Sequence, residues 1–251
     1  MGICIAYTGK LREPALVAEL VRDLEARAEA VGWPHKTMSE LVAEKLVTSP
    51  GLEGITLYPH RACDPLHFHF DQEGTFVNHS NYAFLQDTEM GKMMREALAE
   101  SIAFTRRLTQ GSRNEAGRPG RGNAGDSGLH VSIGIPGLPD APGKDFFEQG
   151  VRYNFTKTQF AGAKVHVAVC AILRYVKQRY APALEIKDDS GYFVDGDFEK
   201  LETQLAYVDY LTSITSQAVK AAAAPMAGPM TLDVFVDRIN EELAAAKNKL
   251  H

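Results

Sequence analysis

The stretch "LHFHFDQEGTFVN", residues 66–78, decides how the first half of this chain folds. Apolar and polar residues alternate along it, which is typical of a strand that buries one face. Side chains of such a strand point alternately to its two faces. The apolar face carries Leu66, Phe68 and Phe70. The polar face carries His67, His69 and Asp71. A glycine-containing turn over 72–74 then predicts a hairpin with Thr75 opposite Asp71.

The preceding segment "GITLYPH", residues 54–60, is the expected partner strand. Its apolar positions are Ile55 and Leu57. The apolar faces of the two strands coincide only if odd positions of the first lie opposite even positions of the second. A pairing with His60 opposite His67 satisfies this condition, and a slip of one residue would bury the histidines.

This register predicts one polar face that gathers five side chains, namely Tyr58, His60, His67, His69 and Asp71. Histidines two positions apart on a strand are close enough to share an ion, and a carboxylate adds a further ligand. One hypothesis is therefore a divalent metal such as zinc, held by His60, His67, His69 and Asp71. The alternative is the ordinary polar face of an antiparallel sheet, solvated or covered by a helix. The sequence alone favours this alternative.

A second candidate metal site is the acidic segment "KDDSGYFVDGD", residues 187–197. Asp188, Asp189 and Asp195 supply the oxygen ligands that Ca²⁺ or Mg²⁺ prefers, although their spacing is not that of an EF-hand. The alternative is that these aspartates belong to turns and to the start of the next helix, with Gly196 as its N-cap.

Two single residues also have chemically active side chains. His166 lies among valines in a predicted helix, so we interpret it as a core or boundary histidine. Cys63 lies in the turn-like context "HRACDP", but no thiolate-activating pattern surrounds it.

The periodicity of the rest of the chain predicts helices at 16–31, 39–47, 82–109, 160–180, 197–219 and 231–250. Ser39 is the expected N-cap of the second of these. Short strands are expected at 3–8, 129–139 and 184–189. This pattern predicts an α+β fold, with an antiparallel meander in the first half and long amphipathic helices packed on mixed sheets.

A polar, glycine-rich stretch suggests how the chain divides. We expect an N-terminal α+β half, a flexible loop, a C-terminal α+β half, and a linker with a terminal helix. These units are residues 1–110, 111–128, 129–224 and 225–251. One compact domain is the alternative. The 231–250 helix either packs on its own domain or binds a second copy or a protein partner.

The charge and composition of the chain limit the compartment and the partners that we expect. The chain has 251 residues and a net charge of -5, so there is no electrostatic reason to expect nucleic acid or an anionic membrane as a partner. No apolar run is long enough to span a bilayer. Its three cysteines are widely spaced, which is typical of reduced thiols in a cytoplasmic protein.

The sequence contains no nucleophile-elbow, zinc-protease or dinucleotide-binding pattern. We therefore expect a cytoplasmic binding or interaction protein without catalytic activity. The alternative is a metal-dependent hydrolase that uses the histidine and aspartate face to activate water.

Overall fold

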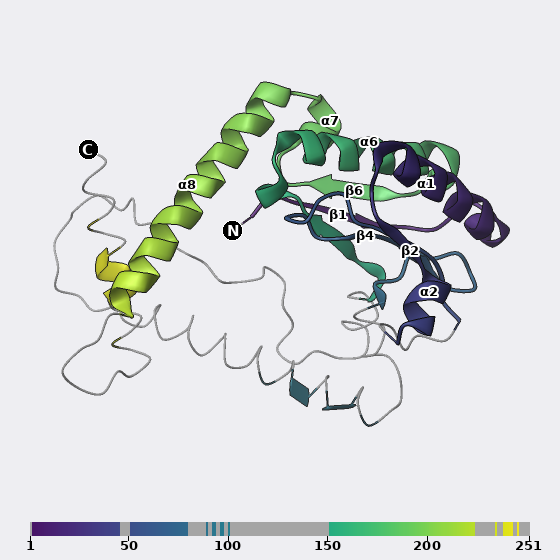
Figure 1. Ribbon diagram of the computed structural model, residues 1–251, viewed down its shortest axis with the longest axis horizontal. Coiled ribbons are helices and arrows are strands. Elements are labelled where there is room, and N and C mark those ends of the chain that lie inside the picture. The colour runs from purple at the N-terminus through teal and green to yellow at the C-terminus, as the bar shows by residue number, and fades with distance from the viewer. Residues whose placement is uncertain are drawn as a thin grey trace, which may run out of the picture.

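A computed structural model describes residues 2–45, 51–79, 151–223 and scattered positions at 89, 92–93, 96–97, 100, 234, 238–242 and 245. It confirms the α+β fold, in which helices pack with two three-stranded sheets (Figure 1). Every strand pair is antiparallel, whereas the sequence led us to expect mixed sheets.

The first sheet has the order β5-β1-β6 and joins distant parts of the chain. Its central strand is β1 (Cys4–Thr8), and its edges are β5 (Asn154–Lys157) and β6 (Glu185–Asp188). β1 and β6 were predicted from the sequence, but β5 was not. A four-residue strand with one apolar side chain, such as "NFTK", gives little periodic signal.

The second sheet has the order β2-β3-β4 and contains the predicted pair of strands. Its strands are β2 (His35–Thr37), β3 (Glu53–Leu57) and β4 (Leu66–Phe70). Ile55 lies opposite Phe68, so the expected facial parity is confirmed. The pairing of His60 with His67 is wrong, because Thr56 lies opposite His67. β3 ends at Leu57, since Pro59 has no N–H to continue the ladder.

The hairpin that follows β4 forms as expected. The backbone N–H of Asp71 donates to the carbonyl of Thr75 at 3.1 Å, and that of Val77 donates to His69 at 2.9 Å. A bridge between Phe70 and Phe76 continues the same register. The segment 75–77 therefore runs antiparallel to the end of β4.

Gly54 allows β3 and β4 to approach each other closely beside His69. Its φ is +139°, and a Cβ at this position would lie 2.0 Å from the carbonyl oxygen of Phe68. A side chain there would force the strands apart, so glycine is required for this geometry.

Of the two helices of the first half, α1 follows its prediction closely, whereas α2 ends four residues earlier than predicted. A short 3₁₀ turn, η1 (Pro14–Leu16), leads into α1 (Val17–Val31), which ends at Gly32 with a left-handed φ of 70°. α2 (Met38–Ala43) is N-capped by Thr37 and not by Ser39. Thr37 and Glu40 form a capping box, which satisfies two backbone N–H groups at once.

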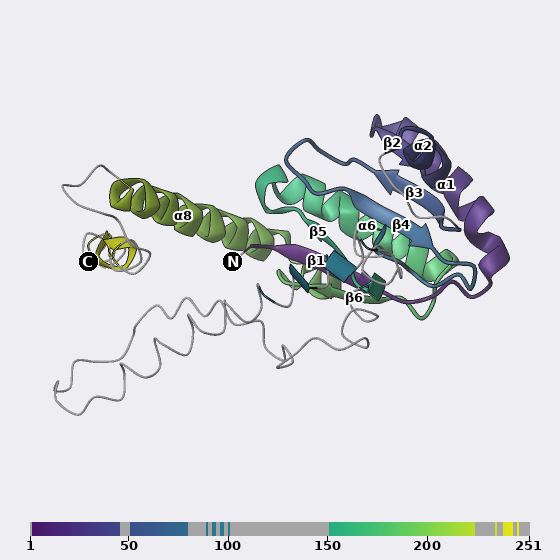
Figure 2. The same ribbon diagram turned by 90° about the horizontal axis from the view of Figure 1, so that it is seen from below.

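The helices of the second half begin with the 3₁₀ turn η3 (Gln159–Ala161) and the long α6 (Ala163–Arg179). After β6, the short α7 (Tyr192–Asp195) precedes α8 (Phe198–Ala222). The N-cap of α8 is Asp197 and not Gly196, because the Asp197 carboxylate accepts from the Lys200 N–H. α8 leaves the body at α7 and points away from both sheets (Figures 1 and 2).

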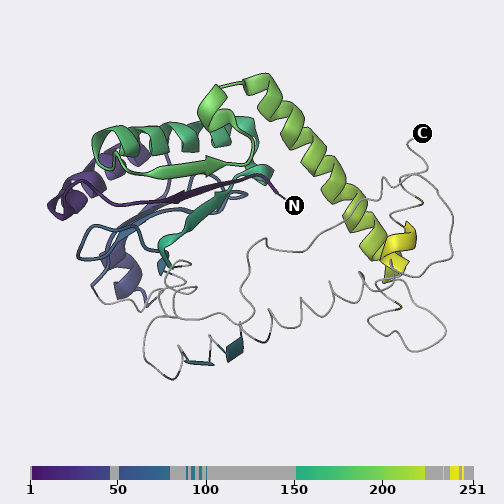
Figure 3. The same cartoon turned by 180° about the vertical axis from the view of Figure 1, so that it is seen from behind.

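One large core joins both sheets to α1 and α6, which lie on the same side of the strands (Figures 1 and 3). Ile5 and Tyr7 enter it from β1, Leu20 and Leu24 from α1, Phe68 from β4, and Val169 and Leu173 from α6. A smaller second cluster consists of Met38, Leu41, Leu52, Val77 and Val151.

Several sequence predictions fall outside the described residues. They concern the loop at 111–128 and the strand at 129–139. Of the helices expected at 82–109 and 231–250, only scattered positions are described, and those positions are helical. Within the described parts of the chain, no helix combines the length and the apolar character needed to cross a membrane.

Candidate metal centre

Three histidines come together where β4 and its hairpin end. His67 and His69 lie on β4, and His79 follows the hairpin. One ligand nitrogen from each lies within 4.8 Å of the other two. The His79 ring centroid is 4.8 Å from those of both other rings, which are 5.2 Å apart. We call these three residues the histidine cluster.

The end of the hairpin brings His79 to the cluster. Val77 pairs with His69 across the hairpin, and His79 follows two residues later in a helical conformation. The N–H of Asn78 donates to the carbonyl of Val151 at 2.6 Å and holds this segment in place. Sequence analysis missed His79, because it lies just beyond the predicted strand at 75–78 and is helical, so strand alternation does not describe it.

The histidine face of the sheet is covered rather than solvated. His69 is 0% exposed and Thr56 is 1% exposed, while His67 and His79 are half-buried. The interpretation as a solvent-facing sheet is therefore wrong. The second apolar cluster explains the difference, because its residues Leu52 and Val77 have the same facial parity as these side chains.

Neighbouring strands fix the two histidines of β4. The Thr56 hydroxyl oxygen lies 3.1 Å from His67 Nδ1 and 2.8 Å from His69 Nε2. From β1, the Tyr7 hydroxyl donates to the His67 carbonyl and accepts from its N–H, both at 2.9 Å. Thr56 and His67 therefore form a non-hydrogen-bonded pair of β3 and β4, in which side chains lie closest.

Burial keeps the histidine cluster uncharged. It lowers the pKa of His67 to about 3, with a smaller contribution from His79. Burial, with the neighbouring histidines, lowers the pKa of His69 well below its usual value, and burial also lowers the pKa of His79. The rings are therefore neutral at pH 7, which is the form that binds metals. Among the described residues, no carboxylate belongs to this group.

Polar atoms without partners lie in this part of the interior. Within the described structure, His69 Nδ1 is fully buried and has no hydrogen-bond partner. The same is true of both amide atoms of Asn154, which pairs with Tyr7 across the first sheet. Buried polar atoms are nearly always satisfied, so the lone pair or hydrogen of His69 Nδ1 is available to a ligand.

Two of the predicted ligands lie elsewhere. His60 is exposed in the loop after β3, where its Nδ1 accepts from the Ala62 N–H at 3.1 Å. The Asp71 carboxylate stabilises the hairpin turn by accepting from the N–H groups of Glu73 and Thr75, at 3.0 and 2.9 Å. The structure thus brings His67 and His69 together with His79, and not with His60 or Asp71.

A second buried group surrounds His166 on α6. We call Thr158, His166, Asp188 and Ser190 the His166 network. Thr158 Oγ1 lies 2.7 Å from His166 Nδ1, and Asp188 Oδ2 lies 3.2 Å from His166 Nε2. The Ser190 hydroxyl donates to Asp188 and lies 3.2 Å from His166 Nε2. Cys170, one turn after His166, completes a possible His/Cys/Asp ligand set.

Hydrogen bonds hold Asp188 ionised in this network. Burial alone would raise its pKa, but bonds from His166 and from the N–H groups of Phe193 and Ser190 lower the pKa to about 2. Asp189 and Asp195 do not join it. The Asp189 carboxylate accepts from the Cys4 N–H at 3.2 Å, and that of Asp195 accepts from Lys200 Nζ at 2.6 Å.

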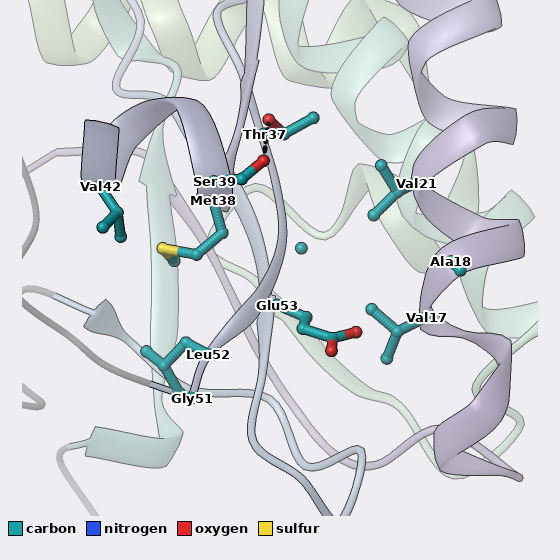
Figure 4. A pocket seen from close by; sticks show the side chains of 11 residues that line it. Val17, Ala18, Val21, Thr37, Met38, Ser39, Val42, Gly51, Leu52 and Glu53 are labelled. Atoms are coloured by element: carbon teal, nitrogen blue, oxygen red, sulfur yellow. Dashed lines mark hydrogen bonds between the residues drawn. The ribbon is translucent and has the colours of Figure 1, made fainter. Parts of the chain in front are cut away.

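A separate groove of about 610 Å³ lies between α1, α2 and β3 (Figure 4). Its walls carry aliphatic side chains such as Val17, Val21 and Met38. The Thr37 and Ser39 hydroxyls hydrogen-bond to each other at 3.0 Å, beside the α2 capping box. No histidine lines this groove, so it is not part of the histidine cluster.

Comparison of the chain with protein-family models, with curated proteins and with solved structures found no match.

Proposed function

We propose that this protein binds one transition-metal dication of the zinc class through His67, His69 and His79. The observation that carries this proposal is the convergence of three imidazoles, with one fully buried ring nitrogen that lacks a partner. Neutral imidazole nitrogens suit zinc, copper, iron and nickel, whereas Mg²⁺ and Ca²⁺ require oxygen ligands.

The spacing of the rings fits such an ion after small side-chain movements. Three nitrogens bound to one tetrahedral zinc at about 2.0–2.1 Å lie about 3.4 Å apart. The ligand nitrogens of the cluster already lie within 4.8 Å of one another.

Two kinds of activity fit this site, namely metal binding without catalysis and metal-dependent hydrolysis. A binding protein without catalysis needs only the three ligands, and three free cysteines favour the cytoplasm as its location. Three protein ligands leave one open position, which is the ligand number of catalytic zinc sites. The partial exposure of His67 and His79 favours access to that position, so a metal-dependent hydrolase is the second candidate.

Zinc binding to the full chain tests the first proposal. We expect calorimetry to show one zinc ion per chain. His67→Ala and His79→Ala should each weaken binding by at least about 100-fold, since even loss of an outer-shell partner costs 10–100-fold. His60→Ala is the matched control, because His60 lies outside the cluster. Equal zinc binding by His67→Ala, His79→Ala and the unchanged protein would contradict the proposal.

Hydrolysis of p-nitrophenyl acetate separates the two candidates. If the protein is a hydrolase, the zinc-loaded form accelerates this reaction and His67→Ala loses the acceleration. If the zinc-loaded form gives only the rate of the zinc-free form, the hydrolase candidate is contradicted for this ester and metal binding stands.

A further inference from the structure

We infer that Thr56 is a positioning residue that selects the donor atoms of the proposed site, so that His69 binds metal through Nδ1 and His67 through Nε2. This inference rests on the proposed metal site and adds to it a specific coordination mode. It follows from the shared hydroxyl of Thr56, which faces one nitrogen of each ring.

The single hydrogen of the Thr56 hydroxyl limits which nitrogens of the two rings can carry a hydrogen. A hydroxyl has one hydrogen and two lone pairs, and a neutral imidazole has one N–H and one lone pair. Thr56 can donate to only one of His67 Nδ1 and His69 Nε2. At least one of these nitrogens must therefore carry a hydrogen and donate to the Thr56 oxygen. The ring that donates keeps its lone pair on the opposite nitrogen.

His69 is the ring whose tautomer the surroundings decide. Its Nε2 has the shorter contact with Thr56, at 2.8 Å, and its Nδ1 is fully buried without a partner. If Nδ1 carried the hydrogen, an N–H donor would be buried with no acceptor among the described residues, which is costly. With the hydrogen on Nε2, the buried atom is a lone pair that is available to a metal ion.

His67 then completes the arrangement. Its Nδ1 faces Thr56 at 3.1 Å, so the nitrogen left for a metal is Nε2. In the metal-bound form Nδ1 carries the hydrogen, and the Thr56 oxygen accepts from both rings with its own hydrogen turned away. In the metal-free form the hydroxyl hydrogen can point to His67 Nδ1, which places the ring hydrogen on Nε2. Binding thus exchanges one tautomer of His67 for the other and leaves the ring neutral.

The ¹⁵N NMR spectra of the histidine rings test this assignment in the full chain. In the metal-free protein we expect His69 with its hydrogen on Nε2. On addition of zinc, we expect the metal-induced shifts at His69 Nδ1 and His67 Nε2. Thr56→Val keeps the branched shape but removes the hydroxyl, so it should mix the His69 tautomers and weaken zinc binding by about 10–100-fold. Thr56→Ser should restore both properties.

Thr158→Val is the matched control, because Thr158 is an equally buried threonine whose hydroxyl contacts a histidine ring outside the cluster, that of His166. It should leave the His69 tautomer and the zinc affinity unchanged. A hydrogen on His69 Nδ1 in the metal-free protein, or zinc bound at His69 Nε2, overturns the inference and leaves the proposed function standing. If the unchanged protein binds no zinc, both are overturned.

Discussion

The histidine cluster and the His166 network both bury imidazole side chains, yet their hydrogen bonds differ. In the His166 network both ring nitrogens have partners, and a carboxylate held by several donors lies beside the ring. In the histidine cluster, Thr56 serves two rings, no carboxylate is present among the described residues, and His69 Nδ1 has no partner. The two sites therefore differ more clearly in the number of polar atoms without a hydrogen-bond partner than in burial.

This difference indicates separate roles. A fully satisfied network resists change, because adding an ion would break bonds that already exist. A network with an orphaned nitrogen gains a bond when an ion enters. We therefore interpret the His166 network as a structural link between β5, α6 and β6, and this difference supports the histidine cluster as the proposed metal site.

The largest expected effect comes from Asp188→Asn. The change places an amide where Asp188 accepts from Ser190 and Phe193, and it leaves His166 without its carboxylate. We expect the free energy of unfolding to fall by about 3 kcal/mol, as measured by urea denaturation. Zinc stoichiometry should not change.

Asp189→Asn is the control for this change, because its carboxylate accepts one hydrogen bond at an exposed position. It should cost less than about 1 kcal/mol. Loss of zinc binding in Asp188→Asn, with the protein still folded, would show that the His166 network is the metal site and would reverse the comparison.

Tyr7→Phe should have the next largest effect, since it disconnects the histidine cluster from the first sheet. The backbone N–H and carbonyl of His67 would lose their shared partner inside the protein. We expect a loss of roughly 2–3 kcal/mol in urea denaturation and weaker zinc binding. Tyr153→Phe, at a position that is 44% exposed, should change neither quantity. An unchanged stability of Tyr7→Phe would mean that other groups satisfy the His67 backbone.

The smallest expected effect is the loss of stability at low pH. The pKa of Asp188 is lowered to about 2, below its usual value, so its contribution is present above about pH 4 and is lost as the pH falls towards 2. The shift corresponds to about 2 kcal/mol. The urea midpoint of the unchanged protein should fall over this range more steeply than that of Asp188→Asn. Parallel curves would contradict the assignment of this shift to Asp188.

The sequence was sufficient for the alternation that places His67 and His69 on one face, because strand periodicity depends on local geometry alone. The sequence was insufficient to predict the register of β3 and β4. The end of β3 depends on how the loop at 58–65 crosses to β5. The Asp64 N–H, for example, donates to the Lys157 carbonyl from a distant strand. A contact of this kind leaves no trace in local periodicity.

The same reasoning explains the acidic segment. Asp188, Asp189 and Asp195 suggested a cation-binding loop because three carboxylates lie close together in the sequence. In the structure their carboxylates accept from different donors, and for Asp188 that includes a histidine 22 residues earlier in the chain. His79 was missed for a different reason. It directly follows the predicted strand "TFVN" and is helical, so strand alternation does not place it.

The position of β1 has a consequence for how the chain is made. β1 is the central strand of its sheet, and it leaves the ribosome before both neighbours, which lie about 150 or more residues later in the chain. At about 5–20 residues per second, β1 waits roughly 8–30 s for its first partner. Such distant pairing also slows folding, because a long loop must close before the contacts form. The nascent β1 therefore lacks both of its neighbouring strands until about 150 further residues have been synthesised.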